Sequence, residues 1–170
     1  MGESEFPPQP TLRVGRYTVQ GVLARGGMAT VHVGRLRGKG GFTRIVAIKQ
    51  LRANYANDPE FRPMFVDEAR LSARITNLNV VPTLDVVEEG RELFLVLEYV
   101  RGASLGQLLS RARKENIPVP VPVVAAIFSD ALKGLHAAHE TKDDRGSLVD
   151  LVHRDISPEN ILVGADGSSR

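Results

Sequence analysis

The sequence has 170 residues, of which 42% are hydrophobic and 25% charged, proportions close to those of an average globular domain. This length accommodates one domain or two small lobes and excludes two full-sized enzymes. The absence of cysteine excludes disulfides, thiolate metal sites and cysteine nucleophiles. Twenty-two Lys and Arg residues against 20 Asp and Glu give a net charge of +2, without a basic run that could follow a nucleic-acid backbone. The composition therefore indicates a globular protein that does not bind nucleic acid.

The beginning of the chain differs in character from the rest. Residues 1–12 are rich in proline and polar side chains, and they are expected to be disordered because they offer little apolar surface to offset the entropy of ordering. They include Glu3 and Glu5 and lack the features of a signal sequence. No apolar run in the chain approaches the roughly 20 residues that a membrane helix needs. The sequence thus predicts a cytoplasmic protein without a membrane segment.

The next part of the chain has the pattern of β-strands. Tyr17–Leu23 and Thr30–Gly34 flank the glycine pair Gly26–Gly27, which predicts a β-hairpin. A glycine-rich loop then leads to Ile45–Leu51, whose β-branched and apolar residues are typical of a buried strand. Further along, Val80–Val87 and Leu93–Val100 are two apolar runs joined by a charged connection, which predicts a second hairpin. The sequence therefore predicts five strands.

One helix is predicted between these two groups of strands. Asn57-Asp58-Pro59 is a helix-start signal, and Pro63 is expected to restart the helix one turn later. The residues that follow recur at intervals of three and four, so that one helical face is expected to hold Phe65, Glu68, Leu71, Ser72, Ile75 and Leu78. Glu68 is the charged member of this face.

The last 70 residues are mostly helical in pattern. Helices are predicted over Leu105–Lys114 and from Pro122 to about His139. An apolar stripe on the longer helix is expected to hold Val124, Phe128, Ala131, Leu132, Leu135 and Ala138. Near the end, Asp166-Gly167 is a strong hairpin-turn signal, yet the three residues after it leave no material for a second strand.

Three features of the sequence suggest chemistry. Backbone N–H groups at the Gly26–Gly27 turn could cradle phosphate, although an ordinary tight turn has the same pattern. Lys49 on a buried strand needs an anion and Glu68 on an apolar helix face needs a cation, so the two are expected to pair unless Glu68 extends to water. Asp155 in His153-Arg154-Asp155, with Asn160 five residues later, could supply a proton acceptor and a metal ligand. His136 and His139 lack a third ligand and are not expected to hold a metal.

Together these motifs resemble the protein-kinase family, in its bacterial eukaryotic-like Ser/Thr branch, from about Tyr17 to Arg170. The matching residues follow the family's order: Gly26, Gly27, Val46-Ala47-Ile48-Lys49, Glu68, His153-Arg154-Asp155 and Asn160. The resemblance implies an α+β, protein-kinase-like fold. Its N-lobe, with a five-stranded antiparallel sheet and one main helix, would cover residues 13–100, and an incomplete helical C-lobe would cover residues 101–170.

The resemblance also implies the roles of individual residues. Lys49 would hold the α- and β-phosphates of ATP and pair with Glu68, Asp155 would accept the proton of the protein substrate's hydroxyl, and Asn160 would bind Mg²⁺. The adenine pocket and the hinge hydrogen bonds would involve Leu23, Val31, Ala47, Leu97, Glu98, Val100 and Leu162. Plain core packing would explain many of these apolar positions equally well.

Three departures from the family pattern bear on activity. Ala24 and Ala29 replace the outer glycines of the loop, and alanine is unfavourable at positive φ. Ser157 stands where Ser/Thr kinases commonly have a lysine near the transferring phosphate. The family continues to Asp-Phe-Gly, whose aspartate holds Mg²⁺, and these 170 residues do not contain that motif. The apolar stripe of the long helix is expected to be exposed for the same reason.

Three functions are compatible with these observations. The first is transfer of the γ-phosphate of ATP to a protein Ser or Thr hydroxyl, as part of a longer kinase domain. The second is a catalytically inactive fragment that acts as a nucleotide-binding or interaction module. A small-molecule phosphotransferase is less favoured, because His153-Arg154-Asp155 with Pro158-Glu159-Asn160 resembles the protein-kinase form.

Overall fold

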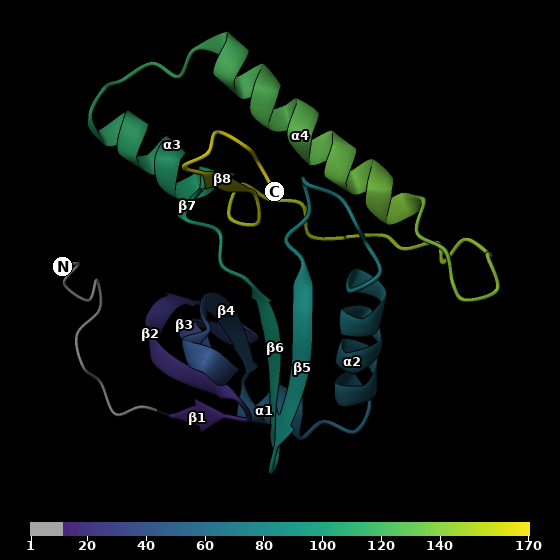
Figure 1. Ribbon diagram of the computed structural model, residues 1–170. Helices are drawn as coiled ribbons and strands as arrows, with labels where there is room; N and C mark the ends of the chain where they lie inside the picture. The colour runs from purple at the N-terminus through teal and green to yellow at the C-terminus, as the bar shows by residue number, and fades with distance from the viewer. Residues whose placement is uncertain (1–11) are drawn as a thin grey trace. The chain divides into compact units, whose positions relative to one another are not determined.

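The computed structural model describes residues 12–170 except for the side chain of Glu68 (Figure 1). Residues 1–11, most of the segment expected to be disordered, lie outside the described residues. Two compact units form the chain: one combines the residues up to Arg70 with Thr83–Tyr99, and the other combines Leu71–Pro82 with Val100–Arg170. The short segment that follows the first long helix thus belongs to the second unit.

The first unit contains a six-stranded antiparallel sheet in the order β1-β2-β3-β4-β6-β5. Its strands are β1 (Arg13–Val14), β2 (Tyr17–Arg25), β3 (Ala29–Arg37), β4 (Thr43–Leu51), β5 (Thr83–Glu89) and β6 (Glu92–Glu98). The five expected strands and both hairpins are confirmed. β1 is an additional sixth strand, and Leu12 beside it accepts a hydrogen bond from the Val19 amide at 2.8 Å. The number of strands was therefore underestimated, because a two-residue strand has no alternation to detect.

The helical part of the first unit starts with α1 (Ala53–Ala56), followed by α2 (Phe61–Ser72). The Asp58 carboxylate caps α2 by accepting from the amides of Glu60 at 2.9 Å and Phe61 at 3.1 Å. Pro63 does not restart the helix: it lies in the first turn of α2, where an amide has no intrahelical acceptor.

The expected helical face is wrong beyond Ser72, where α2 ends. Ile75 and Leu78 lie past the helix, and 86% of Leu78 is exposed. The side chain of Asn77 accepts a hydrogen bond from the Asn79 amide at 2.8 Å and stabilises a turn there. Such local side-chain bonds compete with continued helix, which is why periodicity alone extended α2 too far.

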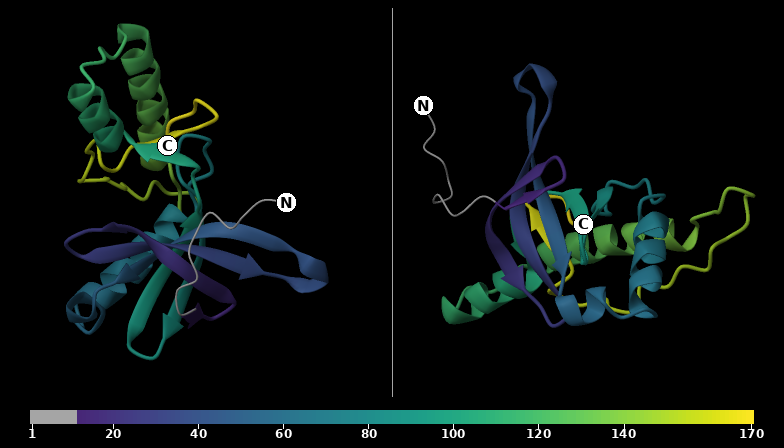
Figure 2. Two further views of the ribbon diagram at one scale, coloured as in Figure 1. Left: turned by 90° about the vertical axis from the view of Figure 1, so that its left-hand side faces the viewer. Right: turned by 90° about the horizontal axis from the view of Figure 1, so that it is seen from below.

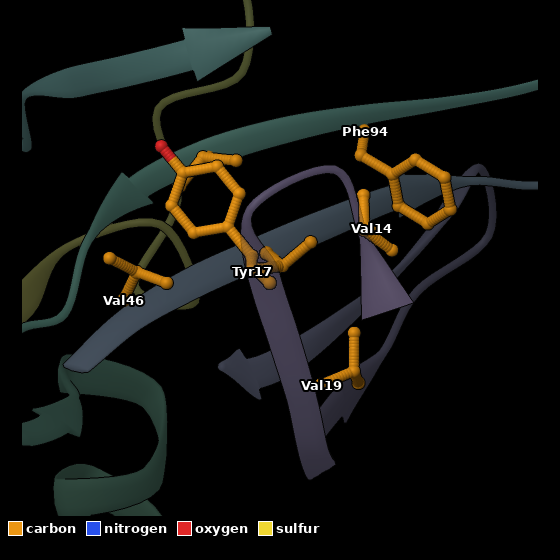
Figure 3. Close-up of a cluster of buried hydrophobic side chains, with 7 residues drawn as sticks. Val14, Tyr17, Val19, Val46 and Phe94 are labelled. Atoms are coloured by element: carbon orange, nitrogen blue, oxygen red, sulfur yellow. The ribbon is translucent and has the colours of Figure 1, made fainter. Parts of the chain in front are cut away.

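Alternate residues of the strands enter two different apolar clusters. One face of the sheet carries a core cluster (Figure 3) consisting of Val14, Tyr17, Val19, Val46, Ile48, Phe94 and Val96. The other face packs against α1 and α2 through Leu51, Ala56, Phe65 and Leu93. This separation follows from the two-residue period of a strand. Apolar residues therefore occur on both faces of the central strands and do not simply alternate with polar ones.

The second unit contains α3 (Leu105–Lys114), α4 (Val121–His139) and a small sheet of β7 (Gly102–Ser104) with β8 (Leu162–Gly164). Both helices are confirmed close to their expected bounds. Ser104 and Gln107 form a capping box that fixes the start of α3. The core of this unit is formed by Leu105 of α3, Ile127 of α4 and Ile161, which immediately precedes β8.

The expectation that the apolar stripe of α4 is exposed is confirmed at Phe128 and Leu132, whereas Ala138 of the stripe is buried. The buried positions of this helix are Ile127, Gly134 and Ala138, whereas Phe128 and Leu132 are 54% and 62% exposed. A Cβ atom at Gly134 would overlap the carbonyl oxygen of Asn79. The close approach of Asn79 therefore requires glycine on the packed face of α4.

α4 also bears on the expectation that no apolar segment approaches a membrane span. An 18-residue window of this 19-residue helix has a mean hydropathy of 1.3, and α4 is the one helix in residues 12–170 that is long and apolar enough to cross a membrane. That corrects the expectation. The finding is weak evidence for a span, since the core helix of a soluble protein satisfies the same criterion. Asp130 of this helix accepts a hydrogen bond from the Ser169 amide at 3.1 Å, within the same unit.

Candidate active site

The glycine turn between β2 and β3 is open to a ligand. The Gly26 amide donates to the Ala29 carbonyl at 2.9 Å and closes the turn. A Cβ atom at Gly27 would have no neighbour within 4 Å, so packing inside the protein does not require glycine there. In residues 12–170 neither Ala24 nor Ala29 has a positive φ. The two alanines therefore cause no backbone strain, contrary to the concern raised by the sequence.

Four of the expected nucleotide contacts share one face of the sheet. Val31 pairs with Lys49, and Ala47 pairs with Leu97, in the antiparallel ladders. Residues opposite one another lie on the same face, as do residues two apart, such as Ala47 and Lys49. All four are half-buried, whereas Val46 and its neighbours on the opposite face are buried completely. This face therefore differs from a closed core, although its role in binding adenine stays a prediction.

Lys49 projects from β4 toward α2. Its Nζ atom lies 6.0 Å from the centre of the Phe65 ring, at the outer limit of a cation–π contact. Glu68 follows Phe65 by three residues on α2, but its side chain lies outside the described residues. The expected pair of Lys49 with Glu68 stays a prediction. Phe65 was expected only as part of the apolar helix face, and its contact with the ammonium was not foreseen.

The residues expected at the hinge differ in their surroundings. Glu98 ends β6, opposite Val46, and its carboxylate binds Arg44 at 2.7 Å. Val100 lies outside the strands, and its backbone amide and carbonyl form no hydrogen bond with the described residues. They are thus available to a ligand. Leu23 lies at a β-bulge of β2 and is 39% exposed, so it is not a core residue.

Asp155 and Asn160, five residues apart, are in direct contact in the second unit. The side-chain amide nitrogen of Asn160 donates to the backbone carbonyl of Asp155 at 2.8 Å and to the Oδ2 atom of Asp155 at 2.8 Å. Both neighbours are acceptors, which fixes the orientation of the amide and directs its own oxygen away from Asp155. The side chain of Asp155 is exposed. A carboxylate held on one side and open on the other can accept a proton from a bound hydroxyl.

The backbone around Asp155 is strongly turned. Its amide donates to the carbonyl of His153 at 2.8 Å, and Arg154 between them has a φ of 60°. A non-glycine residue in the left-handed region costs energy and is frequent at functional sites. The backbone N–H of Asn160 donates a hydrogen bond to the backbone carbonyl of Ser157 at 3.0 Å. Ser157 thus shapes the loop through its backbone, whatever its side chain does.

The segment after Asp155 is attached to the start of α3. The amides of Leu105 and Gly106, unpaired within the helix, donate to the carbonyls of Ile161 and Pro158, each at 2.8 Å. Leu162 follows in β8, where it pairs with Ser104 and is half-buried. This attachment was missed in the sequence. The Ser104-x-x-Gln107 capping box indicates where the helix starts. Nothing in the sequence indicates which carbonyls accept hydrogen bonds from the first amides of the helix.

The Asp166-Gly167 hairpin turn is confirmed. The Gly164 amide donates to the Ser168 carbonyl at 2.8 Å, and the Leu162 amide donates to the Arg170 carbonyl at 2.7 Å. The chain pairs across the turn through an isolated bridge between Val163 and Ser169, and no strand follows β8 in the described residues, as expected. The Ser168 hydroxyl, then the Ser168 amide and Arg170, lower the pKa of Asp166 to about 2. Asn79 donates to the Ser169 carbonyl at 2.9 Å and joins the segment after α2 to this hairpin.

Across the described residues, no three His, Asp or Glu side chains gather as a metal site. The amide oxygen of Asn160 is a hard oxygen ligand of the kind that Mg²⁺ prefers, and its neighbour Asp155 adds negative charge. Mg²⁺ commonly takes only one or two protein ligands when phosphates and water complete its shell. Asn160 therefore fits a partial magnesium site.

Comparison with known proteins gives a consistent result. The family model for the protein kinase domain matches residues 17–170. The serine/threonine-protein kinase PknL of Mycobacterium bovis is 40% identical over 164 residues, which cover 95% of this chain and 37% of PknL. The tyrosine-protein kinase MasK of Myxococcus xanthus is 36% identical over 173 residues, which cover 95% of this chain and 27% of MasK.

Solved structures agree. The crystal structure of the Mycobacterium tuberculosis PknI kinase domain matches with a TM-score of 0.72 and 27% identity, over 94% of this chain and 58% of that one. The chain thus spans about a quarter to two fifths of the two curated relatives named above, and somewhat over half of a solved kinase domain. On its motifs, its fold and these matches, the chain belongs to the protein kinase family, with bacterial serine/threonine kinases among its relatives.

Proposed function

We propose that these residues are the nucleotide-binding and catalytic-loop part of an ATP-dependent protein kinase, which transfers the γ-phosphate of ATP to a Ser or Thr hydroxyl of a protein. The observation that carries this proposal is the contact between Asn160 and Asp155. The family match, to a domain longer than this chain, supports it. A cytoplasmic location, where ATP is available, belongs to the same proposal.

Asp155 is the proton acceptor in this proposal. Asn160 occupies its Oδ2 atom, so Oδ1 is left to accept the proton of the substrate hydroxyl. As the proton moves to Asp155, the hydroxyl oxygen forms a bond to the γ-phosphorus, and the bond from that phosphorus to the ADP oxygen breaks. The hydrogen bonds of Asn160 restrict rotation of the carboxylate. Correct orientation before the reaction lowers the entropy lost in reaching the transition state.

Asn160 would hold one Mg²⁺ ion through its amide oxygen, since its nitrogen is committed to Asp155. When bound, the ion neutralises the charge that develops on the phosphate oxygens. On the first unit, Lys49 would hold the α- and β-phosphates, and Val31, Ala47 and Leu97 would contact the adenine. Their common position on one half-buried sheet face supports this assignment.

A tyrosine hydroxyl is a second candidate acceptor. MasK, a relative with 36% identity, is named a tyrosine-protein kinase, whereas PknL is named a serine/threonine-protein kinase. Ser157 replaces the lysine that is common in Ser/Thr kinases, so this position does not favour either acceptor by its charge. Phosphoamino-acid analysis of the products distinguishes the two acceptors directly.

The proposal is tested with the complete protein that contains this chain. Transfer of labelled phosphate from ATP to Ser, Thr and Tyr peptides should occur, and Asp155→Asn should reduce it about 10²- to 10⁴-fold, the usual contribution of a general base. Asp150→Asn is the matched control, because Asp150 is exposed in the same loop and its φ of 50° suits asparagine. Binding of ATP without any transfer would instead identify a nucleotide-binding module, the remaining alternative.

A further inference from the structure

Positive charge is concentrated in the first part of the chain. Residues 6–57 contain no Asp or Glu, and their Lys and Arg residues are Arg13, Arg16, Arg25, Arg35, Arg37, Lys39, Arg44, Lys49 and Arg52. Residues 58–170 contain 18 acidic and 13 basic residues. A small total charge of +2 therefore conceals a strong asymmetry. Such an asymmetry is a recognised sign of binding to an anionic surface.

The β3–β4 hairpin carries part of this charge beyond the rest of the sheet. β3 pairs with β2 only as far as Leu36, and β4 pairs with β6 only from Val46 onward. The hairpin tip, residues 37–45, is therefore not flanked by another strand of the first unit, and both views in Figure 2 show this hairpin projecting from the sheet. Within its unit the tip is thus a convex projection.

The tip combines apolar and cationic side chains. Phe42 and Ile45 are 56% and 40% exposed, and Arg37 and Lys39 beside them are also exposed. The ring of Phe42 lies over Gly38, where an added Cβ atom would come within 3.1 Å of Cδ1. A hydrogen bond of 2.8 Å from the Gly38 amide to the Phe42 carbonyl closes the turn. The closed turn and the packing against Gly38 therefore hold the ring of Phe42 in a defined position at the tip.

The ion pairs of the described residues leave the outer cations available. Arg44 is paired with Glu98, whereas neither Arg37 nor Lys39 forms an ion pair with residues 12–170, the side chain of Glu68 aside. An exposed aromatic ring next to unpaired cations suits the boundary between anionic lipid headgroups and hydrocarbon, where rings insert and cations bind phosphate.

Other anionic partners fit the tip less well. A stable protein interface buries about 800 Å² on each partner, which a convex tip of nine residues cannot provide. Binding to single-stranded nucleic acid uses several aromatic rings on which successive bases stack, and the tip contains only Phe42. The aliphatic side chain of Ile45 would gain nothing from a phosphate backbone, but it adds exposed apolar area to the same tip for a lipid surface.

We propose that the hairpin tip docks on the surface of a membrane that contains anionic lipids, with Phe42 inserted at headgroup level and Arg37 and Lys39 bound to lipid phosphates. This docking does not depend on the kinase activity. It is expected to be weak on its own, because two cations and one ring provide only a marginal anchor. The tip would therefore orient the protein at the membrane, and a second membrane-binding contribution would be needed for stable attachment.

The experiment uses the absence of tryptophan from the sequence. In these 170 residues, Phe42→Trp introduces a single tryptophan at the tip, which selective excitation distinguishes from the three tyrosines. Vesicles of phosphatidylcholine with phosphatidylglycerol should shift its emission to the blue, high salt should reverse the shift, and phosphatidylcholine alone should cause none. The double variant Arg37→Gln, Lys39→Gln should weaken vesicle binding about 25-fold, or about fivefold for each cation.

A matched control has the same change of charge elsewhere. Arg113→Gln with Lys114→Gln removes two exposed cations from α3 and should leave vesicle binding unchanged. Equal loss of binding in both double variants would overturn the proposal, because it would show a non-specific charge effect. Sedimentation of the proteins with vesicles measures this without the tryptophan, so the comparison does not depend on how Phe42→Trp folds.

A second control addresses the exposed apolar residues of α4. Phe128→Trp places the fluorophore on that helix, where 54% of Phe128 is exposed. The proposal expects Trp at position 128 to be unaffected by vesicles. A shift at position 128 without one at position 42 would overturn it in favour of α4. A shift at position 42 with an oligonucleotide or an acidic peptide but not with vesicles would overturn it too.

Discussion

The side-chain amide of Asn160 spans two acceptors of Asp155, its backbone carbonyl and its Oδ2 atom, at 2.8 Å each. One side chain therefore fixes both the loop and the carboxylate that it contains. The amide oxygen of Asn160 remains for a metal ion, so proton transfer and metal binding are linked through a single residue.

Replacing Asn160 should affect both properties. Asn160→Ala removes the two hydrogen bonds and the oxygen ligand, so the Mg²⁺ concentration needed for half-maximal kinase activity should rise about 10- to 100-fold. The measurement is a Mg²⁺ titration of phosphate transfer by the complete protein. Asn54→Ala, in α1 and exposed, is the control. An unchanged Mg²⁺ requirement in Asn160→Ala would argue against the proposed metal site.

Lys49 should determine affinity for ATP. A hydrogen bond to a charged group contributes about 1.5–3 kcal/mol, so Lys49→Ala should weaken ATP binding about 10- to 100-fold. Titration calorimetry on the complete protein measures this directly. Lys114→Ala removes an equal charge from the surface of α3 and should not alter the affinity. If both variants bind ATP like the wild type, the assignment of Lys49 is wrong.

Two glycines should respond in opposite ways to alanine. A Cβ atom at Gly102 would overlap the Val163 carbonyl in the β7–β8 ladder, so Gly102→Ala should lower the free energy of unfolding by about 1–3 kcal/mol. At Gly27 an added methyl group meets nothing within 4 Å, so Gly27→Ala should leave stability unchanged while weakening ATP binding. Thermal unfolding followed by circular dichroism, with and without ATP, separates the two effects. Equal melting temperatures for both variants would contradict the described β7–β8 packing.

The hairpin at Asp166 should be sensitive to acid. The pKa of this carboxyl is lowered from 3.8 to about 2 by the Ser168 hydroxyl, the Ser168 amide and Arg170. A lowered pKa in the folded state means that the stabilisation is complete above about pH 4 and is lost as the pH falls through about 2. The backbone amide resonance of Ser168 and the guanidinium resonances of Arg170, which both donate to the Asp166 carboxylate, should therefore shift in this range. Asp166→Asn should abolish the shift, and persistence of the shift in that variant would exclude Asp166 as its cause.

The buried and exposed sides of α4 should differ in their response to substitution. Ile127 is 7% exposed and packs against Leu105, so Ile127→Ala should destabilise the protein by about 2–4 kcal/mol. Leu132 is 62% exposed, so Leu132→Gln should have little effect on stability and should reduce aggregation. Chemical denaturation and light scattering measure the two properties. A larger loss of stability in Leu132→Gln than in Ile127→Ala would reverse the described orientation of the helix.

The strands and the loop motifs were accessible from sequence because their signals are local. Apolar runs with a glycine pair between them predicted the first hairpin, and apolar runs with a charged connection between them predicted the second. The spacing of Asp155 and Asn160 predicted that these two residues share a site. Two features were not accessible in this way. The end of α2 at Ser72 is followed by a local side-chain hydrogen bond of Asn77, which a helical period does not detect. The packed face of α4 depends on the approach of the distant residue Asn79 to Gly134. Tertiary contacts override periodicity in such places.

The attribution of Leu71–Pro82 to the second unit has a practical consequence. The backbone passes between the two units three times, after Arg70, Pro82 and Tyr99. A protease that cleaves near Tyr99 would therefore separate Asn79 from Ser169, the residue whose carbonyl it binds. Neither fragment would be an intact unit, and a chimaera that exchanges one unit with a relative would require three junctions in place of one.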